Sequence, residues 1–315
     1  MSNKITLSVV LATLNEEQNV GLCLDSVKDI ADEIVVVDED SIDKTREIAE
    51  KYRAKVFTVI HEPIFHITKQ KAIDKATGDW ILQLDADERA TKELRDEIKK
   101  VINSSNDDLL NRVLSRPERT LSKVERGVEG SPKKIGLFLR HEELIRKREG
   151  QLGKHTGEAM PAGRQVVAFF IPRRNFFLGK PLIHAGVYPD GVIRLIKRGK
   201  ARLPGKSVHE VMEVDGEIGW LFNDLEHHES PTFNRYLERM NRYTDLQAEE
   251  LKERKIPANY WNLFKYSFLL PTSYFLKLFI RHKGFLDGMR GFVWSVFSSL
   301  HYPLSYFKYW QTVKK

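Results

Sequence analysis

Three clusters of acidic side chains each follow a short apolar run of the sequence. The clusters are Asn15-Glu16-Glu17, Asp38-Glu39-Asp40-Ser41 and Asp85-Ala86-Asp87-Glu88. If the runs are neighbouring parallel strands, their carboxyl ends meet at one edge of a sheet, where ligands bind in open α/β folds. Asp85 and Asp87 are two positions apart, so an extended segment would point both side chains to the same side. Carboxylate oxygens arranged in this way suit Mg²⁺ or Mn²⁺ bound to a diphosphate.

A plainer interpretation is that each carboxylate at a strand end only caps the helix that follows it. Converging anions also repel one another unless a cation or hydrogen-bond donors lie among them. The sequence has neither the G-x-G-x-x-G pattern nor a P-loop, which argues against a dinucleotide oxidoreductase and a P-loop ATPase. The remaining possibility is a site in which acidic groups and a metal hold a nucleotide.

The segments that must position these clusters alternate between two patterns of apolar residues. Short apolar runs rich in β-branched residues alternate with segments whose apolar residues have helical spacing, and Thr91 is placed to cap a further helix. This alternation predicts βαβ units and a mostly parallel sheet in an α/β protein. The expected strands are 5–12, 34–38, 55–60 and 80–84, and the expected helices are 17–30, 41–52, 69–77 and one after Thr91.

The second half of the chain predicts more strands and then helices. Residues 166–171, 192–197 and 208–214 have the composition of strands, some of them antiparallel, and 233–252 has helical spacing. Between the two halves, 104–165 is rich in charge, Gly and Pro. We expect it to be an insertion on the acceptor side, partly disordered without acceptor; a solvated surface appendage is the alternative.

Composition and charge separate a globular body from a basic, aromatic tail. The chain has 315 residues, 41% of them apolar and 30% charged, and Cys23 is its one cysteine. The fractions of apolar and charged residues are typical of a globular protein. A single cysteine excludes an intramolecular disulfide. The net charge of +7 resides entirely in 259–315, which also hold 17 of the 32 aromatic residues. Basic charge interleaved with aromatic residues suits an anionic membrane surface better than a nucleic acid, although packing on the rest of the protein is the alternative.

Several ordered motifs resemble glycosyltransferase family 2. They are SVVLATLNEE at 8–17, IVVVDEDSIDKT at 34–45 and GDWILQLDAD at 78–87. Later motifs resemble the lipopolysaccharide-core glucosyltransferase-like branch of this family: IPRRNFFLG at 171–179, YPD at 188–190, IRLIKR at 193–198, VHE at 208–210 and YLERMNRY at 236–243. The resemblance implies a GT-A fold, which is a Rossmann-like domain with a mixed sheet. It also implies a nucleotide-diphosphate sugar donor, a divalent metal and inversion at the anomeric carbon.

The resemblance also assigns roles to residues of the acidic clusters. Asp85 would reach the ribose or the metal, and Asp87 would bind the metal and the diphosphate. The residues expected to line the base and ribose pocket are Ala12, Leu14 and Glu16, with Asp38 or Glu39 at the edge of the base.

An inverting transfer needs a base on the acceptor side. The resemblance places Glu210 in this role, with Asp190 as the second choice; alternatively, Glu210 forms an ion pair with Arg194 or Lys197. Arg194 is expected to clamp the diphosphate or an acceptor phosphate, whereas Arg198 favours the surface. His227 and His228 are each either an additional metal ligand or a structural residue.

The sequence therefore predicts a metal-dependent inverting glycosyltransferase, a hexosyltransferase that acts on a lipid-linked or lipopolysaccharide-type glycan. Its GT-A domain would span 1–258, and amphipathic helices in 259–315 would dock it peripherally on the cytoplasmic face of the membrane. The alternatives are a polyprenyl-phosphate glycosyltransferase and a catalytically inactive membrane adaptor with the same fold.

Overall fold

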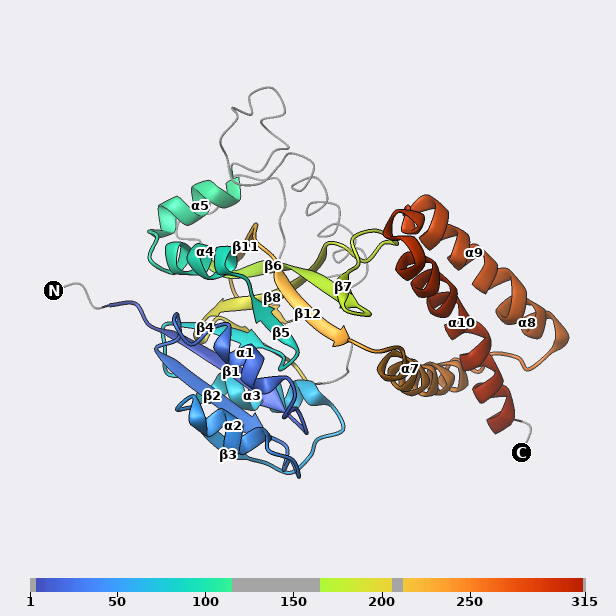
Figure 1. Cartoon of the computed structure of the whole chain (residues 1–315), viewed down its shortest axis with the longest axis horizontal. Coiled ribbons are helices and arrows are strands. Elements are labelled where there is room, and N and C mark those ends of the chain that lie inside the picture. The colour runs from blue at the N-terminus through green and yellow to red at the C-terminus, as the bar shows by residue number, and fades with distance from the viewer. Residues whose placement is uncertain (1–3, 115–164, 206–211, 314–315) are drawn as a thin grey trace, which may run out of the picture. The chain divides into compact units, whose positions relative to one another are not determined.

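The computed structural model describes residues 4–114, 165–205 and 212–313. Its contacts divide the chain into two compact units. The first unit comprises Met1–Arg173 and Pro189–His227, and the second unit comprises Arg174–Tyr188 and His228–Lys315. Figure 1 shows the sheet of the first unit in blue to yellow and the helices of the second unit in brown to red.

A mixed sheet forms the centre of the first unit. Its strands run in the order β3-β2-β1-β4-β8-β6. The neighbours from β3 to β4 are parallel, whereas β8 is antiparallel to both β4 and β6. The bounds are β1 (Leu7–Thr13), β2 (Glu33–Asp38), β3 (Lys55–Thr58), β4 (Trp80–Leu84), β6 (Val166–Phe177) and β8 (Asp190–Lys197).

Shorter strands complete the first unit. β5 (Glu88–Ala90) follows β4 closely and pairs antiparallel with β12 (Leu225–Ser230). β11 (Glu217–Trp220) is parallel to β6, and β9 (Ala201–Arg202) forms a separate ribbon with β10 (Glu213–Val214).

Helices cover both faces of the parallel strands. Alternate strand residues point to opposite faces, and on these strands both sets are buried against helices. On one face, Val9 packs in a cluster with residues of α1 (Val20–Asp25) and α4 (Lys92–Ile102). On the other face, Val10 packs in a cluster with residues of α3 (Phe65–Lys75). The remaining helices of this unit are α2 (Thr45–Lys51) and α5 (Asn106–Leu114).

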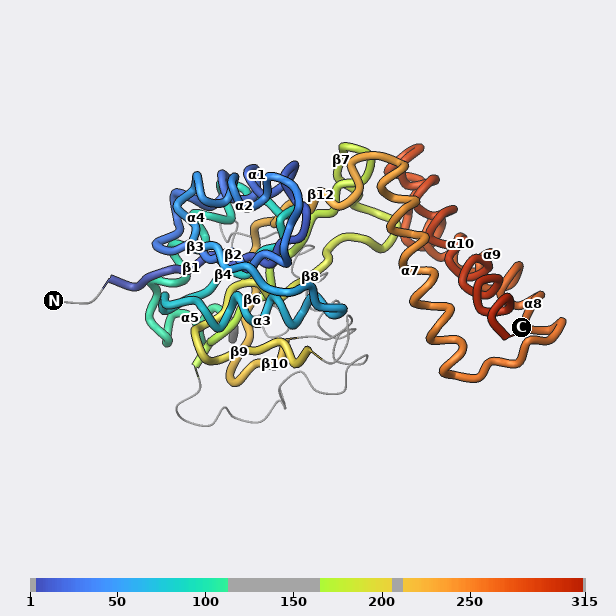
Figure 2. Tube along the Cα trace, turned by 90° about the horizontal axis from the view of Figure 1, so that it is seen from below, coloured from blue at the N-terminus to red at the C-terminus, as the bar shows by residue number. Residues whose placement is uncertain are grey.

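The second unit is mainly helical. α7 (Phe233–Glu253) lies beside α10 (Gly288–Val313) in both views (Figures 1 and 2). Tyr236 and Met240 of α7 are buried in a cluster that includes Trp294 and Phe297 of α10. The other elements of this unit are β7 (Lys180–Pro181), α8 (Tyr260–Phe264), η2 (Lys265–Leu269), α9 (Leu270–Leu276), η3 (Lys277–Arg281) and η4 (Gly284–Asp287). Among the described residues, no helix has both the length and the hydropathy needed to cross a membrane.

The predicted α/β class is confirmed, and so are the mixed sheet of GT-A type and the C-terminal helices. The strand predicted at 80–84 has the bounds of β4, and Thr91 caps α4 by accepting a hydrogen bond from the Leu94 N–H at 3.2 Å. The helix predicted from residue 17 to 30 was too long, since α1 ends at Asp25 and turns follow.

Two predictions concern segments that the structure describes only in part. Residues 115–164, most of the expected insertion, and 206–211, most of the strand expected at 208–214, lie outside the described residues. The contacts group α7 with the helices of 259–315 in the second unit. The extent of the GT-A domain, expected at 1–258, stays a prediction.

Candidate active site

The loops that follow β1 and β2 are joined by hydrogen bonds at the carboxyl edge of the sheet. Asp38 is fully buried at the end of β2. Its Oδ1 accepts from the Ser41 N–H at 2.8 Å, and its Oδ2 accepts from the hydroxyls of Thr13 and Ser41, both at 2.7 Å. Asp38 therefore holds the end of β1 and the loop after β2 together.

The same two loops are joined further along their length. Asn15 has a φ of +54°, a left-handed conformation that asparagine tolerates better than most residues. Its Oδ1 accepts from the Ile42 N–H at 2.9 Å, and its own N–H donates to the Ser41 Oγ at 2.8 Å. The Glu16 N–H donates to the Thr45 Oγ1 at 2.7 Å. The backbone of this loop is thus fixed against the start of α2.

The other predicted pocket residues lie along this joined edge. Ala12 is partly buried, whereas Leu14 is 39% exposed and available for contact with a planar base. The Glu16 carboxylate accepts from the Asn19 side-chain amide at 2.8 Å. Glu39 is buried, and its carboxylate forms a close ion pair with the exposed imidazole of His61.

Asp85 lies just beyond β4 between two cations. Its Oδ1 is 2.5 Å from Lys69 Nζ, and its Oδ2 is 2.5 Å from Arg194 Nη2. Burial raises the pKa of Asp85, but the charges of Arg194 and Lys69 outweigh burial and hold this pKa well below its usual value. Burial lowers the pKa of Lys69, and Asp85 offsets this effect only in part. The two cations supply the neutralising charge that converging carboxylates require.

This cluster extends through β8 and β6. Besides Asp85, Arg194 donates to the side-chain oxygen of Gln83 and to Glu88 Oε1, the latter at 2.7 Å. Arg173 of β6 donates to Glu88 at 3.3 Å and to Asp190 at 2.6 Å. The donors of Arg194 are thus directed at protein carboxylates, which makes it an organiser of the site more than the diphosphate clamp that the sequence suggested. We call Lys69, Asp85, Glu88, Arg173, Asp190 and Arg194 the charge cluster.

Asp87 faces His227. The Glu88 N–H donates to the Asp85 carbonyl at 2.9 Å and closes a turn, so the expectation that 85–87 are extended was wrong. Because of this turn, the carboxylates of Asp85 and Asp87 have different partners. Asp87 Oδ2 is 3.4 Å from His227 Nε2 on β12.

The pairing of β12 with β5 determines which histidine faces Asp87. His227 is opposite Glu88 in the register, and successive strand residues point to opposite sides. His228 instead stacks on Phe176, with ring centroids 4.2 Å apart.

The Asp87–His227 pair fits a divalent metal. Two ligands about 2.1 Å from one ion and at right angles lie about 3 Å apart, close to the separation observed here. In the part of the chain that the structure describes, no three His, Cys, Asp or Glu side chains gather closely enough to hold a metal ion by themselves.

The structure does not test every predicted site residue. Glu210 lies in 206–211, outside the described residues, so its role as the base stays a prediction. Arg173 already engages Asp190, the second choice, through two N–H groups. Arg198 is exposed, as expected.

Sequence reasoning missed Lys69, Gln83 and Arg173, and it named Glu88 in the third acidic cluster without giving it a role of its own. One signal could have revealed Lys69: it is in line with Ala72, Ile73 and Ala76 at helical spacing, on the face of α3 that packs against the sheet. A lysine in such a position needs a buried anion as its partner. Arg173 gives no comparable signal, because its partners lie in other strands.

Comparisons with known proteins agree with the resemblance. The model of Glycosyl transferase family 2 matches residues 8–156. The lipopolysaccharide core biosynthesis glycosyltransferase LpsC of Rhizobium meliloti is 25% identical over 99% of this chain and 94% of its own length. An uncharacterized glycosyltransferase of Rickettsia conorii is 41% identical, but the match covers 32% of this chain and 36% of that relative. The chain thus spans only about a third of that relative's length.

The similarity to solved structures is more distant. Glucosyl-3-phosphoglycerate synthase from Mycobacterium tuberculosis, in complex with phosphoglyceric acid, has a TM-score of 0.40 and 17% identity over 81% of this chain and 82% of that chain. A TM-score this low carries no argument about the fold, which is described from the strand order alone. The family match covers the strands that end at Asp38 and Asp85, and LpsC is similar along nearly the whole length. Residues 8–156 therefore match the model of Glycosyl transferase family 2, and the chain is similar over nearly its whole length to a glycosyltransferase of lipopolysaccharide core biosynthesis.

Proposed function

We propose that this protein transfers a hexose from a nucleotide-diphosphate sugar to a lipid-linked or lipopolysaccharide-type glycan, with inversion at the anomeric carbon. The observation that carries the proposal is the pairing of Asp87 with His227 at the carboxyl edge of a family 2 domain. The similarity to LpsC over nearly the full length supports the type of acceptor.

The joined loops after β1 and β2 would hold the nucleotide. Leu14 offers an exposed apolar side chain to the base, and Ala12 and Glu16 flank it. Because Thr13 and Ser41 already engage both oxygens of Asp38, Glu39 is the better candidate for contact with the edge of the base. Asp85, which Lys69 and Arg194 keep ionised, would accept a hydrogen bond from the ribose.

Asp87 and His227 would hold Mg²⁺ or Mn²⁺. Once bound, such an ion would neutralise the negative charge that develops on the departing nucleoside diphosphate. Asp85 contributes less to this metal than the sequence suggested, because Lys69 and Arg194 are directed at its oxygens.

Glu210 would act as the base on the acceptor side. It would take the proton of the acceptor hydroxyl while that oxygen forms its bond to the anomeric carbon and the bond to the diphosphate oxygen breaks. The support for this role is the match of residues 208–210 to the family motif.

The decisive test is a panel of UDP, GDP and CDP sugars with Mg²⁺ or Mn²⁺ and the purified full-length protein. We expect one donor to bind in a metal-dependent way, and proton NMR of the glycoside product to show the inverted anomeric configuration. If no nucleotide sugar binds with either metal, the inactive adaptor becomes the better hypothesis.

A Glu210→Gln variant separates the two enzyme hypotheses. A glycan hydroxyl needs a base, so this variant should lose most of its turnover, by about 100-fold or more. A polyprenyl phosphate is already a nucleophilic anion. Full activity of Glu210→Gln would therefore favour the polyprenyl-phosphate acceptor.

The second unit would dock the enzyme peripherally on the cytoplasmic face of the membrane. Its helices expose large apolar side chains and carry basic residues among them. Amphipathic helices of this composition bury apolar side chains at the interface and leave Lys and Arg for anionic lipids. The exposed apolar residues include Trp261, Phe264, Phe268, Leu276, Ile280, Phe285, Leu286, Met289 and Phe292, and the exposed basic ones include Lys277, Arg281 and Lys283. We call these residues the docking surface.

A further inference from the structure

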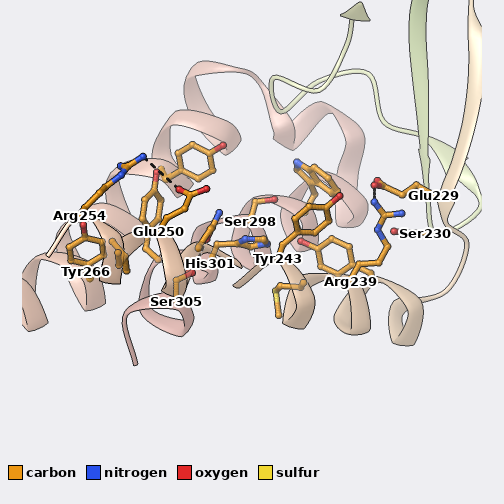
Figure 3. Close-up of a pocket in the computed structure, with 17 residues that line it drawn as sticks. Glu229, Ser230, Arg239, Tyr243, Glu250, Arg254, Tyr266, Ser298, His301 and Ser305 are labelled. Carbon is orange, nitrogen blue, oxygen red and sulfur yellow. Dashed lines mark hydrogen bonds and ion pairs between the residues drawn. The ribbon is translucent and has the colours of Figure 1, made fainter. Parts of the chain in front are cut away.

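The second unit contains a cavity of about 400 Å³ that is open to solvent on one side. It lies between α7 and α10, with η2 and α9 contributing Tyr266 and Tyr274 (Figure 3). Pockets that bind small ligands in proteins range from roughly 300 to 1,000 Å³, so this cavity is large enough for one. None of the roles assigned above uses it.

The lining of the cavity combines aromatic rings that carry polar groups with other polar side chains. Five tyrosines and Trp294 contribute rings, and among the described residues that line it, Met240 and Leu251 are the aliphatic ones. The five tyrosines are Tyr236, Tyr243, Tyr266, Tyr274 and Tyr302. Aromatic residues of this kind combine an apolar face with a hydrogen-bonding edge.

Ion pairs stand at the two ends of the cavity, and neutral polar groups lie between them. Figure 3 shows Arg254 with Glu250 at one end and Arg239 with Glu229 at the other. His301 lies in the middle. Burial lowers the pKa of His301, so its imidazole is neutral at pH 7 and offers one donor and one acceptor.

The lining distinguishes between classes of ligand. A hydrocarbon chain would cover the hydroxyl and imidazole groups of the lining without offering them hydrogen bonds, which is costly. A sugar ring has C–H faces that stack on aromatic rings and hydroxyls that exchange hydrogen bonds with Tyr, Ser and His side chains. The lining therefore matches a carbohydrate better than a lipid tail.

We propose that this cavity binds one or two sugar residues of a glycan. The identification of that glycan as the acceptor rests on the proposed function; the binding of a sugar does not. Tyr243 is 40% exposed at the cavity and is the ring most accessible to such a ligand.

Direct binding to the full-length protein tests the proposal without nucleotide, metal or turnover. The probes are the methyl glycosides of glucose, galactose, mannose and N-acetylglucosamine, measured by saturation-transfer NMR and calorimetry. We expect at least one to bind, with an affinity at least about tenfold lower in Tyr243→Ala, because a stacked ring is lost. Ser298→Leu, which fills the cavity, should reduce binding similarly.

Tyr260→Ala is the matched control, since Tyr260 is 90% exposed in the same unit and does not line the cavity. It should bind the glycoside as the wild type does, and thermal unfolding verifies that every variant is folded. Three outcomes would overturn the proposal: no glycoside binds at millimolar concentration, both cavity variants bind normally, or decanoate occupies the cavity and the glycosides do not. A failure of nucleotide-sugar binding would contradict the proposed function and leave this result standing.

Discussion

Asp85 and Asp87 are neighbours in the sequence but differ in their surroundings. Asp85 is held by Lys69 and Arg194, whereas Asp87 faces His227. At the residue scale, substitutions at these two positions should therefore have different consequences. Loss of Asp87 should affect catalysis, whereas loss of Lys69, a partner of Asp85, should affect stability.

Asp87→Ala should abolish transfer while the fold stays intact. The loss of a group that stabilises charge in the transition state typically lowers kcat by about 100-fold or more. Turnover at saturating donor is the measurement, with the exposed Asp96→Ala on α4 as the control. Near-normal turnover of Asp87→Ala at ordinary metal concentration would contradict the assignment of Asp87 as a metal ligand.

Lys69→Met should instead destabilise the protein by about 3 kcal/mol, because it leaves a buried carboxylate with one cation fewer. The Lys69 side chain is 9% exposed. Lys71 is on the same helix and pairs with Glu62, but its side chain is 37% exposed. Lys71→Met should therefore cost less than about 1 kcal/mol. Urea unfolding measures the loss in free energy of unfolding for both variants. Equal losses would contradict the claim that Lys69 stabilises the protein through the charge cluster.

At the element scale, Glu33 connects four strands at the edge opposite the candidate site. Its carboxylate accepts from Ser8 of β1, from Lys55 of β3 and from Thr77 just before β4. Burial raises the pKa of Glu33, but these hydrogen bonds outweigh burial and lower it to about 2, from an ordinary value of 4.5. The folded protein thus holds this proton less tightly than the unfolded chain.

A group with a lowered folded pKa contributes its full stability above its unfolded pKa and loses it as the pH falls. For Glu33, this loss falls between pH 4.5 and about 2. Glu33→Gln should lower the free energy of unfolding by about 2 kcal/mol at pH 7 and flatten its decline in this window. Urea unfolding at several pH values measures this effect, with the exposed Glu50→Gln as the control. An unchanged pH profile would contradict the assignment.

The order of the elements could be predicted from the sequence, whereas their side-chain partners could not. The apolar runs at 34–38 and 80–84 determine β2 and β4 locally, because buried parallel strands have this composition. The charge cluster joins residues from α3, the turn after β4, β5, β6 and β8, which only the strand order brings together. In the same way, the choice of His227 over His228 depends on the register of β12 with β5.

At the scale of the whole molecule, the basic and aromatic C-terminal part leads to a prediction about location. The protein should float with anionic vesicles but not with neutral ones, and high salt or alkaline carbonate should release it. Trp261→Ser with Phe268→Ser should weaken this binding, because both side chains are more than 60% exposed on the docking surface.

Ile42→Ser with Ile60→Ser is the matched control, since it removes two exposed apolar side chains from the first unit. This pair should float as the wild type does. Retention after carbonate extraction would indicate a membrane-spanning anchor. An absence of binding to any vesicle would favour packing of the docking surface on another part of the protein or on a partner.

The hydrogen bonds between the loops after β1 and β2 have a consequence for the thermodynamics of nucleotide binding. Because Asp38, Ser41, Asn15 and Thr45 fix these loops in the protein alone, their conformational entropy is lost during folding and not when the ligand arrives. A rigid surface of this kind favours fast association without loop rearrangement on this side. It also limits how far the pocket can adapt to a base of another size, so discrimination between purine and pyrimidine nucleotides should be present at the first encounter.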